Sequence, residues 1–461
     1  MSWRTDDMCV AFAGRRLAGS HATATGASID SRTLRPGDIF FAIRGPNFDG
    51  HLFVPTAIAA GASAVVVDAR GAATLPTRVL DAGVAVLVVG DTVAALGRLA
   101  AAHRAIFRGV LVAITGSSGK TTTKEMVAAV LALVGPTLKT EGNLNNHLGM
   151  PLTLLRATAE HAFAAIEMGM SAPGEIAYLA SIAQPQIAVI TSIGAAHLEG
   201  LGSVKSVARA KGEIFRGLSA EDGLAIMPSD VPWSWELTRT LDAPLVLVGD
   251  GPTDEIRLTG VRETRTGASG NVHVGSEKFR LRLRMAGRHN LRNALLAIAV
   301  GLEVGVRPGE AVRALSRVAP PKLRGEVRKL PSGARVVLDC YNANPQSMRA
   351  AVDTFLRRHP EGLVVLGDML ELGPSAQQAH GELGQHVART APGATLVGVG
   401  DLAAHLVYEA RKSGIATAHH AADAEVAAQV VAGIDARDIL LKGSRGIGLE
   451  RIYETLAGEE G

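Results

Sequence analysis

Short apolar runs alternate with segments of helical periodicity along most of this chain. In the first part, strands are predicted at 38–43, 64–67 and 84–89, with a helix at 53–60 between the first two. A longer helical pattern at 92–106 leads into the next region. We therefore predict a small α/β domain over residues 1–88.

The central region repeats this alternation on a larger scale. Buried strands are predicted at 110–114, 163–166, 187–190 and 223–227, and a helix is predicted at 124–131. Such alternation favours a mostly parallel sheet with helices on both of its faces. A more polar insert at 245–285 contains, at 278–284, the alternation typical of a strand with one solvated face. We predict a central domain over residues 89–318.

The clearest linker is Ala319-Pro320-Pro321-Lys322, and the alternation restarts beyond it. Strands are predicted there at 335–338, 363–366, 395–399 and 439–441, and helices at 346–357, 377–389, 402–411 and 424–432. The pattern predicts a small open α/β domain over residues 319–461, without a phosphate-binding loop of its own.

Composition narrows the class of protein. The 461 residues are 47% hydrophobic and 20% charged, as in an ordinary globular enzyme, and they are too many for one core. No apolar run approaches the ~20 residues of a membrane span, and no secretory signal begins the sequence. Cys9 and Cys340 make no disulfide framework, and the net charge of +3 is dispersed. We expect a cytoplasmic, monomeric enzyme without a nucleic-acid partner.

The most informative motif joins the strand at 110–114 to the helix that follows it. It consists of Thr115, Gly116, Ser117, Ser118, Gly119, Lys120, Thr121 and Thr122. Strand, glycine loop, lysine, hydroxyl residues and helix are the parts of a phosphate-binding loop in their proper order. The glycines let backbone N–H groups face the phosphates, Lys120 supplies a positive charge, and Thr121 supplies a hydroxyl for Mg²⁺.

Three ionisable residues follow strands or helices near this loop. Glu167 ends the strand at 163–166, where ligands bind in open α/β sheets, and beside a phosphate-binding loop it is a candidate Mg²⁺ ligand. His197 lies in the loop after the strand at 187–190, and Lys211 lies in a helical stretch. Each residue type is more often simply solvated. A buried Lys211 with a lowered pKa could instead take up CO₂ as a carbamate.

Two polar segments suit a ligand that carries many hydrogen-bonding groups. Asn143, Asn145 and Asn146 fall within a turn-rich loop that ends at Pro151. The alternative for these residues is ordinary turn formation. Asp339 directly follows the first strand of the last domain, where an Asp can hold a ribose hydroxyl.

Several motifs together resemble the Mur ligase family over nearly the whole length. The motifs are Asp30-Ser31-Arg32, Asp49-Gly50-His51, the loop from Gly142 to Leu155, Ala196-His197-Leu198-Glu199-Gly200, Ala208-Arg209-Ala210-Lys211-Gly212-Glu213, Gly287-Arg288-His289-Asn290, Tyr341-Asn342-Ala343-Asn344-Pro345, the segment from Gly367 to Gly373, and Lys442-Gly443-Ser444-Arg445. Independent motifs in the right order are more specific than any one of them. The resemblance is closest to the member that adds D-alanyl-D-alanine to UDP-N-acetylmuramoyl-tripeptide in peptidoglycan synthesis.

The resemblance implies a role for each matching residue. Lys120, His197 and Lys211 would be catalytic, and ATP would be bound by the residues from Thr115 to Thr122 with Asn290, Arg324 and Asp339. Thr121, Glu167, His197 and a carbamylated Lys211 would hold Mg²⁺, with two ions in the site. The substrates would be bound by Ser31, Arg32, Asn47, Asp49, Gly50, His51, Asn143, Asn145, Asn146, Tyr341, Asn342 and Asn344. The implied fold has a small UDP-binding α/β domain, a central ATPase domain and a C-terminal Rossmann-like domain.

The chain departs from the family pattern at several positions, and Ile447-Gly448-Leu449-Glu450 is unusual after the Lys442-Gly443-Ser444-Arg445 motif. Ser171 and Ser192 stand where other residues are usual, Leu323 replaces the glycine expected before Arg324, and Leu338 replaces one of two paired aspartates.

Four alternative functions are open. They are another Mur-type ligase, a folylpolyglutamate synthetase, a P-loop NTPase switch that couples hydrolysis to a partner, and a catalytically inactive relative that serves as a nucleotide-binding scaffold. The intact Lys120, Thr121, Glu167, His197 and Lys211 argue against the last of these. The Asn-rich loop and the Tyr341–Asn344 motif argue against the first two.

Overall fold

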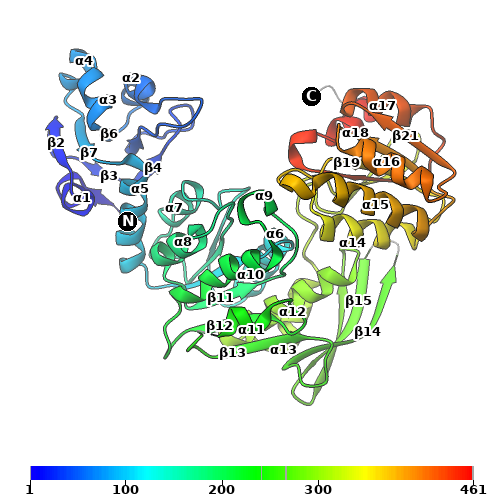
Figure 1. Ribbon diagram of the computed structural model, residues 1–461. Helices are drawn as coiled ribbons and strands as arrows, with labels where there is room; N and C mark the ends of the chain where they lie inside the picture. Colours follow the sequence, from blue (N-terminus) through cyan, green and yellow to red (C-terminus); the bar gives the residue numbers. More distant parts are fainter. Residues whose placement is uncertain (1, 240, 265–266, 459–461) are drawn as a thin grey trace.

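The structure is a computed structural model that describes residues 2–239, 241–264 and 267–458. It has three lobes in chain order, and Figure 1 shows the N-terminal and C-terminal lobes on opposite sides of the central one. Each lobe is built around a mostly parallel sheet, so the predicted α/β class is confirmed.

The N-terminal lobe contains a five-stranded sheet of order β2-β7-β6-β5-β4, in which β2 alone runs antiparallel to its neighbour. A two-stranded β1-β3 ribbon accompanies it. The elements are β1 (Trp3–Arg4), α1 (Thr5–Phe12), β2 (Arg15–Ala18), β3 (Thr23–Ala24), β4 (Gly26–Ser28), β5 (Asp38–Phe41), η1 (Gly50–Phe53), α2 (Val54–Ala59), β6 (Ala64–Asp68), α3 (Ala69–Thr74), α4 (Thr77–Leu80), β7 (Ala85–Val89) and α5 (Thr92–Ile106).

The central lobe contains a nine-stranded sheet of order β16-β15-β14-β13-β12-β11-β8-β10-β9. Its strands are parallel from β9 to β14, and β15 and β16 add an antiparallel wing where the sequence predicted a polar insert. The elements are β8 (Val110–Thr115), α6 (Lys120–Leu131), β9 (Thr137–Lys139), α7 (Gly149–Leu154), β10 (Phe163–Glu167), α8 (Glu175–Ala183), β11 (Ile187–Ile190), α9 (Leu198–Leu201), α10 (Val204–Gly212), η2 (Glu213–Gly217), β12 (Leu224–Pro228), α11 (Ser234–Thr238), β13 (Leu245–Gly249), β14 (Ile256–Thr264), β15 (Gly267–Val274), β16 (Glu277–Leu283), α12 (Arg288–Glu303) and α13 (Pro308–Leu315).

The C-terminal lobe contains a six-stranded sheet of order β17-β18-β22-β19-β20-β21, in which only β17 pairs in antiparallel fashion. The elements are β17 (Glu326–Lys329), β18 (Arg335–Leu338), α14 (Pro345–Leu356), β19 (Leu363–Gly367), η3 (Gly373–Ser375), α15 (Ala376–Thr390), β20 (Thr395–Val399), α16 (Ala403–Lys412), β21 (Thr417–Ala421), α17 (Ala424–Ala432), β22 (Asp438–Lys442), η4 (Arg445–Ile447) and α18 (Glu450–Ala457).

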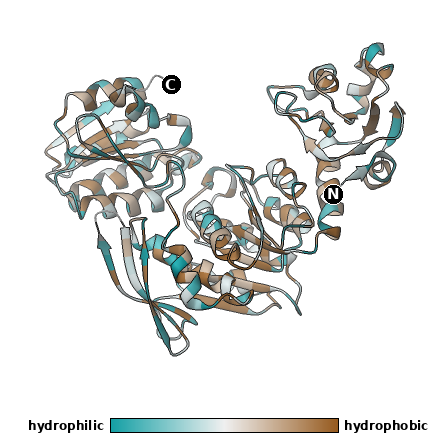
Figure 2. Cartoon of the chain, turned by 180° about the vertical axis from the view of Figure 1, so that it is seen from behind, coloured by the Kyte–Doolittle hydropathy of each residue, from teal (hydrophilic) through white to brown (hydrophobic). Residues whose placement is uncertain are grey.

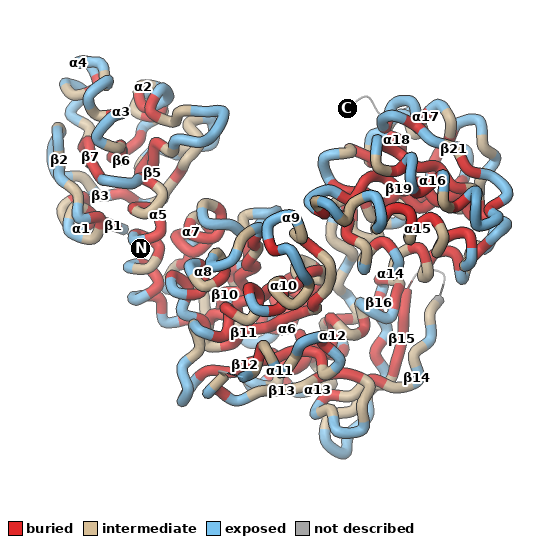
Figure 3. Tube along the Cα trace, viewed as in Figure 1, coloured by how far each residue is buried: buried red, intermediate tan, exposed pale blue. Residues whose placement is uncertain are grey.

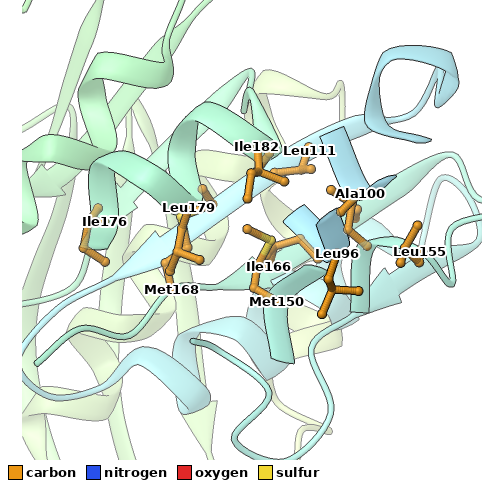
Figure 4. Close-up of a cluster of buried hydrophobic side chains, with 14 of the residues drawn as sticks. Leu96, Ala100, Leu111, Met150, Leu155, Ile166, Met168, Ile176, Leu179 and Ile182 are labelled. Atoms are coloured by element: carbon orange, nitrogen blue, oxygen red, sulfur yellow. The ribbon is translucent and has the colours of Figure 1, made fainter. Parts of the chain in front are cut away.

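Helix α5 connects the first two lobes through a shared apolar core. Figure 4 shows Leu96 and Ala100 of α5 among side chains such as Met150 of α7 and Leu179 of α8. The same cluster extends to Phe41 in the N-terminal sheet. Because one helix buries its residues against both sheets, α5 fixes the N-terminal lobe to the central one.

The strands carry most of the buried residues. In Figure 3 the sheet strands are mainly buried and the outer faces of the helices are mainly exposed, and Figure 2 shows the corresponding hydrophobic interior. In the described residues, no helix is both long and apolar enough to cross a membrane.

Candidate active site

The phosphate-binding loop lies at the carboxyl end of β8, an inner strand of the central sheet between β11 and β10. Gly116 and Gly119 have φ angles of 154° and 84°, in the region that favours glycine. A Cβ at Gly116 would lie 1.9 Å from Thr191 Oγ1, so no side chain fits there. Helix α6 begins at Lys120, whose Nζ donates to the carbonyl of Gly116 at 2.9 Å.

The loop after β11 braces the phosphate-binding loop. Ser192 Oγ accepts a hydrogen bond from the Ser118 amide at 3.0 Å, and the Ser117 amide donates to the Ser192 carbonyl at 2.9 Å. Ser117 Oγ also donates to the Gly194 carbonyl at 3.1 Å. Ser192, one of the departures from the family pattern, therefore supports the loop conformation directly.

Side-chain oxygens of two predicted metal ligands, Thr121 and Glu167, are in contact at the start of α6. Thr121 Oγ1 donates to Glu167 Oε2 at 2.8 Å, and Asn145 Nδ2 donates to Glu167 Oε1 at 2.8 Å. Glu167 is buried at the end of β10. A carboxylate beside a hydroxyl suits Mg²⁺, which prefers oxygen ligands. The hydrogen bond of Asn145 thus connects the Asn-rich loop to the Glu167 carboxylate.

Lys211 is a buried amine without a partner. It lies on α10 with 0% of its surface exposed, and its Nζ has no hydrogen-bond partner in the described part of the chain. Burial, together with the charge of Lys120 nearby, holds the pKa of Lys211 well below its ordinary value. A buried amine whose protonated form is disfavoured fits conversion to a carbamate, which would bring an anionic oxygen donor close to Glu167.

His197 contacts the C-terminal lobe. Its Nδ1 lies 2.6 Å from Oε2 of Glu371, which follows β19. The hydrogen bond with His197 is the main cause that lowers the pKa of Glu371. Among the described residues, no group of three or more His, Cys, Asp or Glu side chains could hold a metal ion. A Mg²⁺ site here would therefore need Thr121 or a modified Lys211 in addition to Glu167 and His197.

A cavity of about 420 Å³ lies between the central and C-terminal lobes. It is lined by the phosphate-binding loop and by Asn290, Arg324 and Asp339, which the sequence predicted as nucleotide contacts. One face of α14 closes it, with lining residues Gln346, Ser347, Ala350, Ala351, Thr354 and Phe355. The structure thus brings these predicted nucleotide-binding residues of both lobes around one space.

The Tyr341–Asn344 segment adjoins this cavity and contacts the phosphate-binding loop. Asn344 Nδ2 donates to the Ser117 carbonyl at 3.1 Å, and the Arg324 guanidinium lies 4.3 Å from the centre of the Tyr341 ring. Asn342 is exposed and lines the cavity. The Asn344 side chain, which we predicted to bind substrate, is thus directed to the loop backbone in this structure.

The remaining central-lobe asparagines lie beside a second cavity or at the surface. Asn146 Oδ1 accepts the amides of Leu148 and Gly149 at 3.1 and 2.9 Å, at the start of α7. Asn146 also lines a cavity with Glu175 and Tyr178. Asn143 is exposed.

The predicted uridine-nucleotide contacts lie in the N-terminal lobe, apart from the phosphate-binding loop (Figure 1). Asp49 Oδ1 contacts His51 Nδ1 at 2.7 Å, and the buried His51 accepts the Asp68 amide through Nε2 at 3.1 Å. Arg32 pairs with Asp30 at 2.6 Å. Gly50 packs against the backbone of Ile43, and Ser31 and Asn47 lie nearer the surface. His51 and Asp49 are thus engaged within the lobe.

Several residues around the cavity between the central and C-terminal lobes were not predicted from the sequence. Asn293 packs against Gly119, and the buried Lys442 pairs with Asp339 at 2.9 Å and donates to the Asn342 carbonyl at 3.2 Å. Lys442 and Glu371 belong to motifs that resemble the family, which was the available signal. Asn293 lies one helical turn after Asn290, and this spacing was its signal.

A phosphate-binding loop at the carboxyl end of a parallel sheet, closed by a second α/β lobe, defines a P-loop enzyme whose nucleotide cavity is shared between lobes. Three family models match the chain: "Mur ligase family, catalytic domain" at 23–104, "Mur ligase middle domain" at 114–301 and "Mur ligase, glutamate ligase domain" at 323–445. The chain belongs to the Mur ligase family, as the motifs predicted.

Similar proteins match over most of their length. The UDP-N-acetylmuramoyl-tripeptide–D-alanyl-D-alanine ligase of Escherichia coli is 36% identical over 442 residues, which are 95% of each chain. A crystal structure of MurF from Acinetobacter baumannii has a TM-score of 0.88 at 33% identity and covers 99% of each chain. MurF ligase from Thermotoga maritima in complex with ADP has a TM-score of 0.81 at 27% identity, covering 94% of this chain and 97% of that one.

Proposed function

We propose that this chain is an ATP-dependent ligase that joins D-alanyl-D-alanine to UDP-N-acetylmuramoyl-tripeptide in peptidoglycan synthesis. The observation that carries the proposal is the cavity between lobes, where the phosphate-binding loop faces Arg324 and Asp339. The full-length similarity to ligases named for this activity supports the choice of substrates.

The reaction requires activation of a carboxylate before an amine can attack it. Attack of the tripeptide carboxylate on the γ-phosphate of ATP releases ADP and gives an acyl phosphate. The free amine of D-alanyl-D-alanine then attacks the acyl carbon, loses a proton, and expels phosphate to leave an amide. Lys120 would neutralise charge on the transferred phosphoryl group, and Arg324, which lines the same cavity, would approach that group from the other lobe. Because an acyl phosphate hydrolyses readily, a lid such as α14 that excludes water has a chemical purpose.

The proposed metal site is formed by Thr121, Glu167, His197 and a carbamylated Lys211. Bound Mg²⁺ would offset negative charge on the phosphates. The neutral Lys211 amine would take up CO₂ with loss of a proton, and the resulting carbamate would give the buried, unpartnered nitrogen an anionic group beside Lys120.

The carbamate has its own test. After incubation of the protein with ¹³C-bicarbonate, we expect a carbamate carbon signal by NMR that is missing from Lys211→Gln. Lys205→Gln is the control, since Lys205 lies on the same helix and is half exposed. An identical spectrum for wild type and Lys211→Gln would contradict the modification.

The remaining assignments divide the substrates among the lobes. We propose that Asn290 and Asp339 contact the nucleoside part of ATP. The acceptor and the tripeptide would be bound by Asn143, Asn145, Asn146, Tyr341, Asn342 and Asn344. The uridine nucleotide would be bound in the N-terminal lobe by Ser31, Arg32, Asn47, Asp49, Gly50 and His51. The domain limits of 1–88, 89–318 and 319–461 are proposed from the sequence pattern, which assigns the connecting helix α5 to the central domain although it also packs on the N-terminal sheet.

The decisive experiment is phosphate release from ATP with UDP-N-acetylmuramoyl-tripeptide, with and without D-alanyl-D-alanine. We expect release only with both substrates, together with a pentapeptide product by mass spectrometry. Tripeptides that end in lysine or in diaminopimelate should be compared, because the third residue selects between related ligases. Release without either substrate would instead identify a P-loop NTPase, and ligation of a single amino acid would identify another Mur-type ligase.

A further inference from the structure

We propose that Glu371 is a positioning residue that orients the imidazole of His197 toward the reaction centre when the C-terminal lobe is docked. The inference rests on the proposed function and assigns to the C-terminal lobe a part in preparing the metal site of the central lobe.

The contact between the two residues is made by side chain and backbone together. His197 Nδ1 lies 2.6 Å from Glu371 Oε2, although the two residues are 174 positions apart in the sequence. The Glu199 amide donates to the Glu371 carbonyl at 3.3 Å, and Gly373 packs against Glu199. The loop before α9 and the loop after β19 therefore fit one another over several residues.

Both partners have a backbone conformation that residues other than glycine adopt uncommonly. His197 has a φ angle of 55° and Glu371 one of 63°, in the left-handed region. Residues other than glycine rarely adopt the left-handed conformation unless the surrounding structure requires it. Such backbone strain is concentrated at functional sites. The Glu371 side chain is 58% exposed, and a partly exposed side-chain hydrogen bond contributes less stability than two such backbone conformations cost. Stability alone therefore does not explain the arrangement.

The hydrogen-bonding chemistry of His197 and Glu371 explains their arrangement better than stability does. A carboxylate can only accept a hydrogen bond, so in the neutral imidazole Nδ1 carries the proton and Nε2 keeps its lone pair. That nitrogen is then available as a ligand for a divalent cation, and the ring cannot turn to offer Nδ1 instead. The charges of Glu371 and Lys120 are close enough to shift each other's pKa, that of Lys120 upward and that of Glu371 downward.

The arrangement makes the histidine depend on the position of the lobe. Glu371 comes from the C-terminal lobe, and Asn344 of the same lobe contacts the Ser117 carbonyl. When the lobe leaves, the His197 ring loses its hydrogen-bond acceptor. The metal site is then fully oriented only in the closed enzyme, where an acyl phosphate is protected from water.

A double-mutant cycle tests the proposal in the full-length enzyme. In Glu371→Ala we expect kcat to fall about 10- to 100-fold, with the KM for ATP changed less than about threefold. Glu371→Gln should retain most of the activity, since its amide oxygen can still accept from Nδ1. The double variant Glu371→Ala, His197→Asn should be no slower than His197→Asn alone. Glu382→Gln is the control, because it loses an exposed ion pair with Arg349 in the same lobe.

A second measurement does not depend on activity. In ¹⁵N-histidine spectra of the protein saturated with ADP and free of Mg²⁺, with the His197 signal assigned from His197→Asn, we expect the Nδ1–H tautomer in wild type and a mixture in Glu371→Ala. Additive effects in the cycle, a change confined to KM, or an Nε2–H tautomer in wild type would overturn the inference. If wild-type enzyme fails to ligate, the proposed function fails, while the tautomer still tests the role of Glu371.

Discussion

At the scale of single residues, we propose that the phosphoryl chemistry depends most on the side chain of Lys120. Its Nζ contacts the Gly116 carbonyl at 2.9 Å and is placed to move onto a phosphate. We expect Lys120→Ala to lower kcat by about 100- to 1000-fold, as loss of one transition-state donor does, while the thermal unfolding midpoint changes little. Lys139→Ala should behave as wild type, because Lys139 pairs with Glu125 on the surface. Full activity in Lys120→Ala would rule out the phosphate-binding assignment.

Leu323 shows how one departure from the family pattern is accommodated. It stands where glycine was expected, and its φ angle of 59° is one that glycine adopts freely, yet its side chain is 5% exposed in the core of the C-terminal lobe. Lost burial should destabilise both Leu323→Ala and Leu323→Gly by about 2–5 kcal/mol. Only the glycine also relieves the backbone strain, worth about 1–2 kcal/mol.

We therefore expect Leu323→Gly to be more stable than Leu323→Ala by roughly 0.5–1 kcal/mol, after the larger entropy of glycine in the unfolded chain is subtracted. Urea unfolding followed by circular dichroism measures the difference. If Leu323→Ala proved more stable than Leu323→Gly, the left-handed conformation at this position would carry no cost in free energy.

At the scale of elements, α14 is both the lid of the nucleotide cavity and a link to the phosphate-binding loop. Asn344 caps it, since its Oδ1 accepts the Ser347 amide at 2.8 Å, and its Nδ2 bonds to the Ser117 carbonyl at 3.1 Å. We expect Asn344→Ala to lose about 0.5–2 kcal/mol of stability and to raise the KM for ATP about fivefold.

The matched control for this prediction removes a cap elsewhere in the same lobe. Asp423 accepts the amides of Glu425 and Val426 at 2.9 Å and caps α17, away from the nucleotide cavity. Asp423→Ala should show a similar loss of stability in denaturant unfolding with an unchanged KM. If both variants raised the KM equally, Asn344 would act only through the stability of the lobe.

Only part of the elements could be predicted from sequence, through periodicity, which reports local structure; helices α8, α12 and α13 and strands β9 and β21 were not predicted. Strand β11 and helix α17 have the predicted limits, whereas α6 begins at Lys120, four residues before its prediction, since Gly119 already turns the chain into the helix. Strand β17 was missed because its polar sequence lacks an apolar run. The contacts of His197 with Glu371 and of Asn344 with Ser117 join residues 174 and 227 positions apart, a distance over which periodicity carries no information.

At the scale of the whole molecule, the lobes differ in how firmly they are joined. One apolar cluster runs from the N-terminal sheet through α5 into the central lobe, with Leu96 at 0% exposure. In the described residues, no apolar cluster spans the central and C-terminal lobes, and polar contacts such as Arg358 with Glu263 at 3.2 Å connect them. Apolar burial dominates cooperativity. The first two lobes should therefore unfold as one unit, and the C-terminal lobe as another.

Calorimetry of paired core variants tests this division. Leu96→Ala should lower the free energy of unfolding of the first unit alone, and Leu366→Ala, at a residue that is also 0% exposed, should lower that of the C-terminal lobe alone. Each loss should be about 2–5 kcal/mol and should lower the midpoint of the corresponding transition. ADP at one hundred times its dissociation constant should add about 2.7 kcal/mol and draw the two transitions together, because its cavity is built from both units. If either variant shifted both transitions in the absence of nucleotide, the polar contacts would be strong enough to couple the lobes. Closure of the C-terminal lobe onto the central lobe would then need no nucleotide.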